Sequence, residues 1–148
     1  LGILPVLGAY FVHTGSYSAN AWVASMPSFF LVHNLLLLNE FPDAEADVTV
    51  GRRTLPVIVG KKRAACFFSF VTVVVYLWLA GAVYLGFMPA CTLVGFLTLP
   101  LALKVIRGSF HYDNREIFLK VMGQNVLLIL ATQALIAAGY IAAGIFVK

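Results

Sequence analysis

The sequence predicts an all-α integral membrane protein, a multi-helix bundle with about five transmembrane segments. Of its 148 residues, 61% are hydrophobic and only 11% are charged, whereas soluble domains carry roughly 25% charged residues. The mean hydropathy is +0.95. The apolar runs lack the alternation of barrel strands and are far longer than such strands, so a β-structure is not expected.

Five apolar runs follow one another along the chain. A membrane-spanning helix needs about 20 mostly apolar residues, so the run at 1–12 is too short alone and is expected to complete a helix begun upstream. Three later runs have the length of a full span; they cover 21–39, 64–88 and 121–147. The run at 90–106 is shorter and carries Pro100. With no internal repeats, we expect a single transmembrane domain over residues 1–148.

The charged residues gather in two loops. The loop after the second run carries five basic residues: Arg52, Arg53, Lys61, Lys62 and Arg63. Four more flank the loop after the fourth run: Lys104, Arg107, Arg115 and Lys120. All six acids fall in the same two regions, and only Lys148 lies elsewhere. Alternating spans put both loops on one face, which the positive-inside rule makes cytoplasmic. Orientation in a lipid bilayer therefore explains the net charge of +4, and no nucleic-acid partner is expected.

The stretch 39–55, NEFPDAEADVTVGRRTL, concentrates carboxylates at the end of an apolar run. Asp43 and Asp47 are four residues apart and Asn39 precedes Asp43 by four, so on a helix all three share one side. Pro42 leaves two possibilities for that helix. Either the apolar helix continues and is kinked there, or a new helix starts with Asn39 as its cap and holds Pro42 in its first turn.

Two neighbouring carboxylates need a cation, and Mg²⁺ commonly takes one or two carboxylates together with water and substrate phosphate. Arg52 and Arg53 are suited to bidentate contacts with phosphate oxygens. The pattern thus favours a diphosphate site at the mouth of the bundle. A solvated loop whose acids face the following basic residues is the alternative that this spacing leaves open.

The stretch N-E-F-P-D-A-E-A-D-V-T-V-G-R-R-T-L-P-V-I-V-G resembles the second aspartate-rich motif of the UbiA superfamily of intramembrane prenyltransferases. It follows the pattern N-x-x-x-D-x-x-x-D-x-x-x-G-[KR]-[KR]-T-L. The resemblance matches Asn39, Asp43 and Asp47 to the motif, and Arg52 and Arg53 to its basic positions. It implies a bundle of nine transmembrane helices with two such motifs, which bind Mg²⁺ and the diphosphate of an isoprenyl donor.

The first motif of that family, N-D-x-x-D-x-x-x-D, does not occur in this sequence. The resemblance therefore implies that the chain is the C-terminal part of the domain, without four N-terminal helices. It further implies transfer of the isoprenyl group to an aromatic acceptor, with Asp43 and Asp47 as catalytic metal ligands. Asn39 and the G-R-R-T-L sequence are most similar to the branch that prenylates 1,4-dihydroxy-2-naphthoate towards menaquinone. The 4-hydroxybenzoate, geranylgeranylglyceryl phosphate and chlorophyll branches share the aspartates and stay open.

Two other function classes stay open as well. A transporter would use Asp43 and Asp47 as a cation site, but the nearby arginines would repel a cation, and transporter sites usually lie at the midplane. An assembly subunit without chemistry would fit the absence of the first motif. No oligomeric state is predicted.

Polar residues within the apolar runs are costly and often functional. His33 and Asn34 lie in the middle of the second run, and we expect each to make a hydrogen bond between helices. The same is expected of three residues in the last run: Gln124, Asn125 and Gln133.

Overall fold

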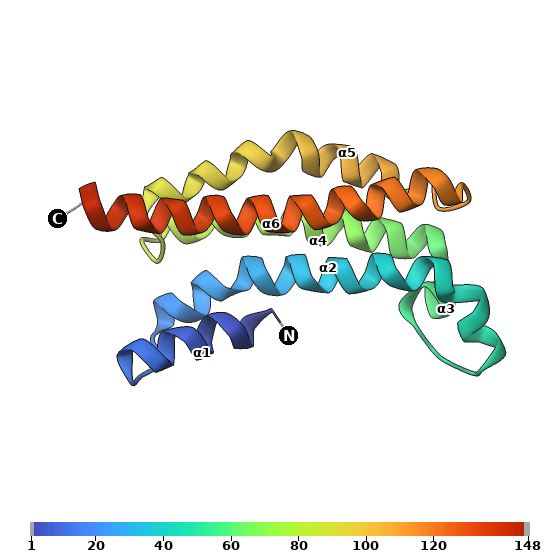
Figure 1. Ribbon diagram of the computed structural model, residues 1–148, viewed down its shortest axis with the longest axis horizontal. Helices are drawn as coiled ribbons and strands as arrows, with labels where there is room; N and C mark the ends of the chain where they lie inside the picture. Colours follow the sequence, from blue (N-terminus) through green and yellow to red (C-terminus); the bar gives the residue numbers. More distant parts are fainter. Residues whose placement is uncertain (1, 147–148) are drawn as a thin grey trace.

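The computed structural model describes residues 2–146, and all regular structure in that range is helical (Figure 1). The elements are α1 (Ile3–Thr14), α2 (Ala19–Thr49), α3 (Leu55–Val59), α4 (Lys61–Tyr84), the 3₁₀ helix η1 (Ala90–Thr98), α5 (Leu99–Ser109) and α6 (Arg115–Phe146). The predicted all-α class is confirmed. Lys148, the one basic residue outside the two charged regions, lies outside the described residues.

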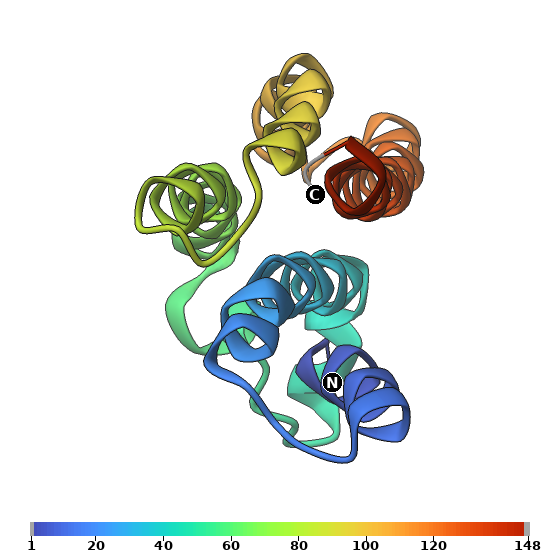
Figure 2. The ribbon, with the colours of Figure 1, turned by 90° about the vertical axis from the view of Figure 1, so that its left-hand side faces the viewer.

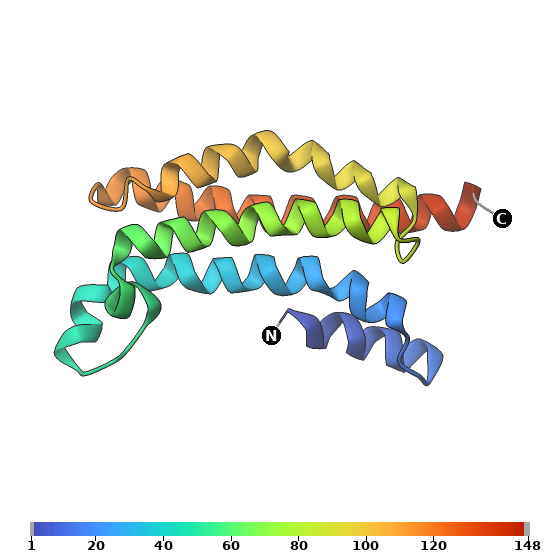
Figure 3. The ribbon, with the colours of Figure 1, turned by 180° about the vertical axis from the view of Figure 1, so that it is seen from behind.

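Four segments within the described range are long and apolar enough to cross a membrane: Ala19–Thr49, Lys61–Tyr84, Ala90–Ser109 and Arg115–Ile145. The fifth apolar helix, α1, is shorter. Seen along the bundle, α2, α4, η1–α5 and α6 form a group of four rods, with α1 beside α2 on its outer side (Figure 2). From behind, the loop after α2 and the loop between α5 and α6 lie at the same end of the bundle (Figure 3).

Helix α2 continues through the charged stretch without a break. It runs from Ala19 to Thr49 and contains both Pro27 and Pro42. Ser18 caps its start, where its Oγ accepts a hydrogen bond of 3.1 Å from the Ala21 amide. A separate helix starting at Asn39 is therefore not what forms, and Asn39 lies inside α2. Membrane helices tolerate internal prolines because neighbouring groups compensate for the missing hydrogen bond.

The α2–α6 contact forms one side of the core. The two helices run in opposite directions (Figure 1), and each carries buried residues at spacings of three, four and three. On α2 these residues are Leu31, Asn34, Leu38 and Phe41; on α6 they are Phe118, Val121, Asn125 and Leu128. The rings of Phe41 and Phe118 are 5.3 Å apart, which sets the register of the pair. This spacing is the a/d pattern of helices that pack as in a coiled coil.

Asn34 is the polar link between α2 and α4. It is 1% exposed, and its Nδ2 donates to the Phe68 carbonyl at 3.1 Å and to Thr72 Oγ1 at 2.9 Å. The hydrogen bond expected of Asn34 is confirmed. For three others the expectation stays a prediction, because one buried nitrogen of each has no hydrogen-bond partner among the described residues: Nε2 of His33, Nδ2 of Asn125 and Nε2 of Gln133.

The segment from Ala90 to Thr98 is wound as a 3₁₀ helix. Two of its threonines donate hydroxyl hydrogen bonds to carbonyls three residues back: Thr92 to Pro89 at 2.7 Å and Thr98 to Gly95 at 2.8 Å. Gly139 of α6 packs directly on this segment, since a Cβ there would meet the Cys91 carbonyl oxygen at 2.6 Å. The backbones of η1 and α6 therefore touch.

Candidate functional site

The two charged loops meet at one end of the bundle, around a cavity of about 460 Å³. Both loops contribute charged or polar side chains to its lining. Those from the α2–α4 region are Asp43, Glu45 and Lys61, and those from the α5–α6 loop and the start of α6 are Tyr112, Asp113 and Arg115. The predicted placement of both charged loops at one end is confirmed.

Aromatic side chains form the apolar side of this cavity and hold the second loop against α2. Phe41 and Phe118, which both line it, are 1% and 3% exposed. The Phe41 ring lies 5.3 Å from that of Phe118 and 6.1 Å from that of Tyr112. Aromatic contacts of this kind add to the free energy gained by burial. The positions of Asp113 and Arg115, on either side of Asn114, thus depend on an anchored loop.

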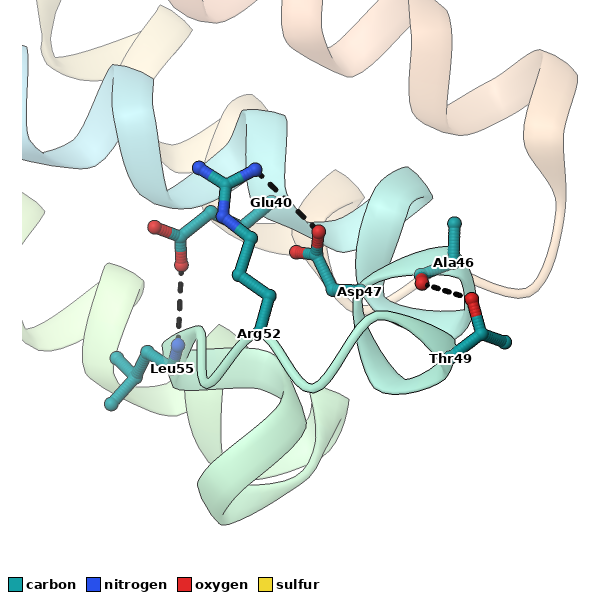
Figure 4. Close-up of polar contacts among 6 residues, drawn as sticks. All are labelled: Glu40, Ala46, Asp47, Thr49, Arg52 and Leu55. Atoms are coloured by element: carbon teal, nitrogen blue, oxygen red, sulfur yellow. Dashed lines mark hydrogen bonds and ion pairs between the residues drawn. The ribbon is translucent and has the colours of Figure 1, made fainter.

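Asp47 and Arg52 form an ion pair across the turn that ends α2 (Figure 4). Asp47 Oδ1 lies 3.5 Å from Arg52 Nη1, and the Arg52 amide donates to the Asp47 carbonyl at 2.8 Å. Gly51, with a φ of 71°, supplies the left-handed conformation that reverses the chain between them. Asp47 is 6% exposed, while 70% of the Arg52 side chain is accessible.

A second contact ties the same loop to α2 (Figure 4). Glu40 Oε2 accepts a hydrogen bond of 3.3 Å from the amide of Leu55, the first residue of α3. The segment 50–55 is therefore held to α2 at both of its ends. Glu40 serves here as an acceptor for the backbone of the loop.

The five residues predicted from the motif fall into three groups. Asp43 is exposed and lines the cavity, whereas Asp47 and Arg52 are engaged with each other. Asn39 and Arg53 are exposed. Of the five, Asp43 alone is among the described residues that line this cavity. The alternative in which the acids face the following basic residues is therefore seen for two of them, since Asp47 pairs with Arg52 at 3.5 Å and Glu45 pairs with Lys61 at 3.2 Å.

The oxygen donors fit Mg²⁺ when substrate supplies further ligands. Among the described residues, no three His, Cys, Asp or Glu side chains are grouped closely enough to hold a metal ion. Mg²⁺ does not need such a group, because it is usually bound by one or two carboxylates with waters and substrate phosphates. Asp43 and Asp47 provide carboxylates of this type on the last turns of α2.

Sequence reasoning had not included the residues of the second loop in the site. Tyr112, Asp113 and Arg115 share the cavity with Asp43, although about 70 residues separate them in the sequence. The one sequence feature that relates these residues to Asp43 is the alternation of membrane spans, which places both charged loops on one face of the membrane. That signal predicts a common end of the bundle but not a common cavity.

The UbiA prenyltransferase family model matches residues 1–122 of this chain. A 1,4-dihydroxy-2-naphthoate octaprenyltransferase from Bacillus subtilis (strain 168) is 30% identical over 108 residues. These cover 73% of this chain and 35% of that relative, so the chain spans about a third of the relative's length. No solved structure matches the chain.

Proposed function

Because this chain belongs to the UbiA prenyltransferase family, we propose that the protein transfers an isoprenyl group from a polyprenyl diphosphate to an aromatic acceptor in a Mg²⁺-dependent reaction. One observation carries the proposal: Asp43 lies in a charged cavity at the end of an apolar helical bundle. Such a place suits a donor with a charged head and a long apolar tail. Within the bilayer, the cavity lies on the cytoplasmic side.

The carboxylates at the end of α2, Asp43 and Asp47, would hold the metal. Bound Mg²⁺ would neutralise charge on the diphosphate and so make it a better leaving group. Asp47 pairs with Arg52 at 3.5 Å and is 6% exposed. Asn39, Arg52 and Arg53 take part in binding the diphosphate, and the exposed guanidinium groups are suited to its oxygens.

The bundle itself protects the reaction from water. Heterolysis of the carbon–oxygen bond leaves an allylic cation and diphosphate, and a ring carbon of the acceptor then supplies the electron pair for the new bond. The ring restores its aromaticity by giving up a proton to an oxygen of the departed diphosphate. Water would compete for the cation, and an apolar surround excludes it. The apolar side chains of Phe41 and Phe118 line the cavity beside Asp43.

The acceptor we propose is 1,4-dihydroxy-2-naphthoate, which places the protein in menaquinone biosynthesis. Support comes from the name of the Bacillus subtilis relative, which is a 1,4-dihydroxy-2-naphthoate octaprenyltransferase. The other acceptors of the family, among them 4-hydroxybenzoate, geranylgeranylglyceryl phosphate and a chlorophyll precursor, are the competing candidates.

The test uses membranes that contain the full-length protein and labelled geranylgeranyl diphosphate. Prenylated product is scored with 1,4-dihydroxy-2-naphthoate and with 4-hydroxybenzoate, in Mg²⁺ or in chelator. Asp43→Asn is expected to lower kcat by about a hundred-fold or more, since loss of metal-assisted charge stabilisation removes several kcal/mol. Glu116→Gln is the matched control, because Glu116 is an exposed carboxylate outside the set that lines the cavity.

Product that depends on both Mg²⁺ and Asp43 supports the proposal, and the better acceptor identifies the branch. If only 4-hydroxybenzoate is prenylated, the assignment to menaquinone biosynthesis is contradicted, while the proposal that the protein is a prenyltransferase still holds. If neither acceptor reacts and no prenyl diphosphate binds, the transferase proposal itself fails.

A further inference from the structure

Five charged side chains line the cavity, and only two of them neutralise each other. Lys61 Nζ lies 3.2 Å from Glu45 Oε1, so these two charges form a pair. The other three are Asp43, Asp113 and Arg115. Within the described residues, none of these three takes part in a salt bridge. The cavity therefore presents two carboxylates and one guanidinium group that no ion pair occupies.

The arginines of the motif are placed differently. Arg52 is engaged with Asp47, and Arg53 is not among the described residues that line the cavity. Arg115 comes from the other charged loop and lies in the same cavity as Asp43. A metal ion held by Asp43 would supply positive charge to a diphosphate in this cavity, and the guanidinium group of Arg115 would donate hydrogen bonds to its oxygens.

The backbone around Arg115 is fixed in place. Asn114 caps α6, because its Oδ1 accepts from the Ile117 amide at 3.1 Å and its carbonyl accepts from the Phe118 amide at 2.9 Å. Phe118 in turn packs on Phe41, only two residues before Asp43. The contact between the two buried rings thus fixes the position of the backbone near Arg115 relative to the backbone near Asp43.

We propose that Arg115 is a substrate-binding residue that contacts the diphosphate of the isoprenyl donor. The proposal rests on the proposed function and adds the α5–α6 loop to the site. A guanidinium group offers two parallel donors to phosphate oxygens, whereas an ammonium group is a point charge. Arg115 therefore contributes to the affinity for the donor.

The experiment measures KM for the donor and KM for the acceptor in the full-length protein. It compares the parent protein with five variants: Arg115→Ala, Arg115→Lys, Arg52→Ala, Arg53→Ala and Arg107→Ala. Arg107 is the matched control, because it is an exposed arginine near the end of α5 and outside the set that lines the cavity. Arg115→Ala is expected to raise KM for the donor by about ten- to a hundred-fold, the range for losing a hydrogen bond to a charged group. KM for the acceptor should stay within about twofold, and Arg115→Lys should recover part of the loss.

A second readout does not depend on turnover. The affinity for a non-reactive geranylgeranyl thiodiphosphate in Mg²⁺ is measured by titration calorimetry on the purified proteins. Arg115→Ala should weaken this affinity by the same factor as it raises KM for the donor, while Arg107→Ala should leave it unchanged. Size-exclusion profiles and thermal transitions of each variant establish that it is folded.

The outcomes separate the two proposals. If the parent protein forms product and Arg115→Ala matches Arg107→Ala in donor KM and analogue affinity, the role of Arg115 is refuted and the transferase stands. An equal rise in KM for donor and acceptor also refutes a diphosphate contact. If the parent protein neither binds the analogue nor forms product, the proposed function fails and this inference fails with it.

Discussion

Asn34 of α2 and Asn125 of α6 lie at the same level of the bundle, each seven residues from the Phe41–Phe118 ring pair. The two helices are antiparallel, so the residue seven before Phe41 is level with the residue seven after Phe118. Both asparagines are 1% exposed. Their bonding differs: Asn34 Nδ2 has two partners on α4, while Asn125 Nδ2 has none among the described residues.

This difference predicts opposite responses to the same substitution. Asn34→Leu should lower the free energy of unfolding by about 1 kcal/mol, within the range found for hydrogen bonds between membrane helices. Asn125→Leu should be neutral or stabilising, because it removes a buried donor that lacks a partner. The measurement is denaturant unfolding of the purified protein in detergent. Equal losses at both positions would contradict this and would indicate that Asn125 binds a buried water.

The contact between η1 and α6 predicts a strict requirement for glycine at position 139. In Gly139→Ala the new methyl group would meet the Cys91 carbonyl oxygen at 2.6 Å and Thr92 Cα at 2.7 Å, which are both backbone atoms. We expect a loss of about 1–3 kcal/mol in the free energy of unfolding, the usual cost of overpacking.

Gly123→Ala provides the control for that substitution. Gly123 lies on the same helix, and a Cβ there meets nothing within 4 Å. Since alanine is the better helix former, this variant should be as stable as the parent protein or slightly more stable. Thermal unfolding of both variants in one detergent gives the comparison, and similar transition temperatures would refute the close approach of η1 and α6.

The Glu40 contact predicts a local change in hydrogen exchange. Glu40→Ala removes the acceptor of the Leu55 amide, so exchange at Leu55 should accelerate by about tenfold, as expected for a net loss near 1.4 kcal/mol. Glu40→Gln retains an acceptor oxygen and should change the rate much less. Glu45→Ala is the control, because Glu45 pairs with Lys61 instead. If the exchange rate of the Leu55 amide is unchanged in Glu40→Ala, the hydrogen bond to Glu40 does not protect that amide in the parent protein.

Most of the fold could be predicted from hydropathy and from the placement of charge. Long apolar runs identify membrane helices because every backbone group must be satisfied within the segment. Helix ends were less predictable: α2 extends ten residues beyond the apolar run that ends at residue 39. Its last turns are polar, and tertiary contacts of Phe41 and Asp47 hold them, so hydropathy carries no signal for that extension.

The site could be predicted only in part. The spacing of Asp43 and Asp47 follows from helix periodicity, but their different environments depend on a loop that folds back on α2. The contribution of Arg115 to the cavity depends on the register of α2 and α6, which the Phe41–Phe118 contact sets. Such a register is a property of packed side chains from distant parts of the chain, so local patterns do not reveal it.

The 3₁₀ winding of η1 changes how far its segment reaches. A 3₁₀ helix rises about 2.0 Å per residue and an α-helix about 1.5 Å, so the nine residues of η1 gain roughly 4–5 Å in length. The 20 residues of Ala90–Ser109 then measure about 34 Å instead of about 30 Å. Against a hydrocarbon core about 30 Å thick, this segment can tilt by roughly 30° from the bilayer normal and still cross it. The 3₁₀ winding thus allows this shorter segment to cross the membrane at a tilt, as its longer neighbours can.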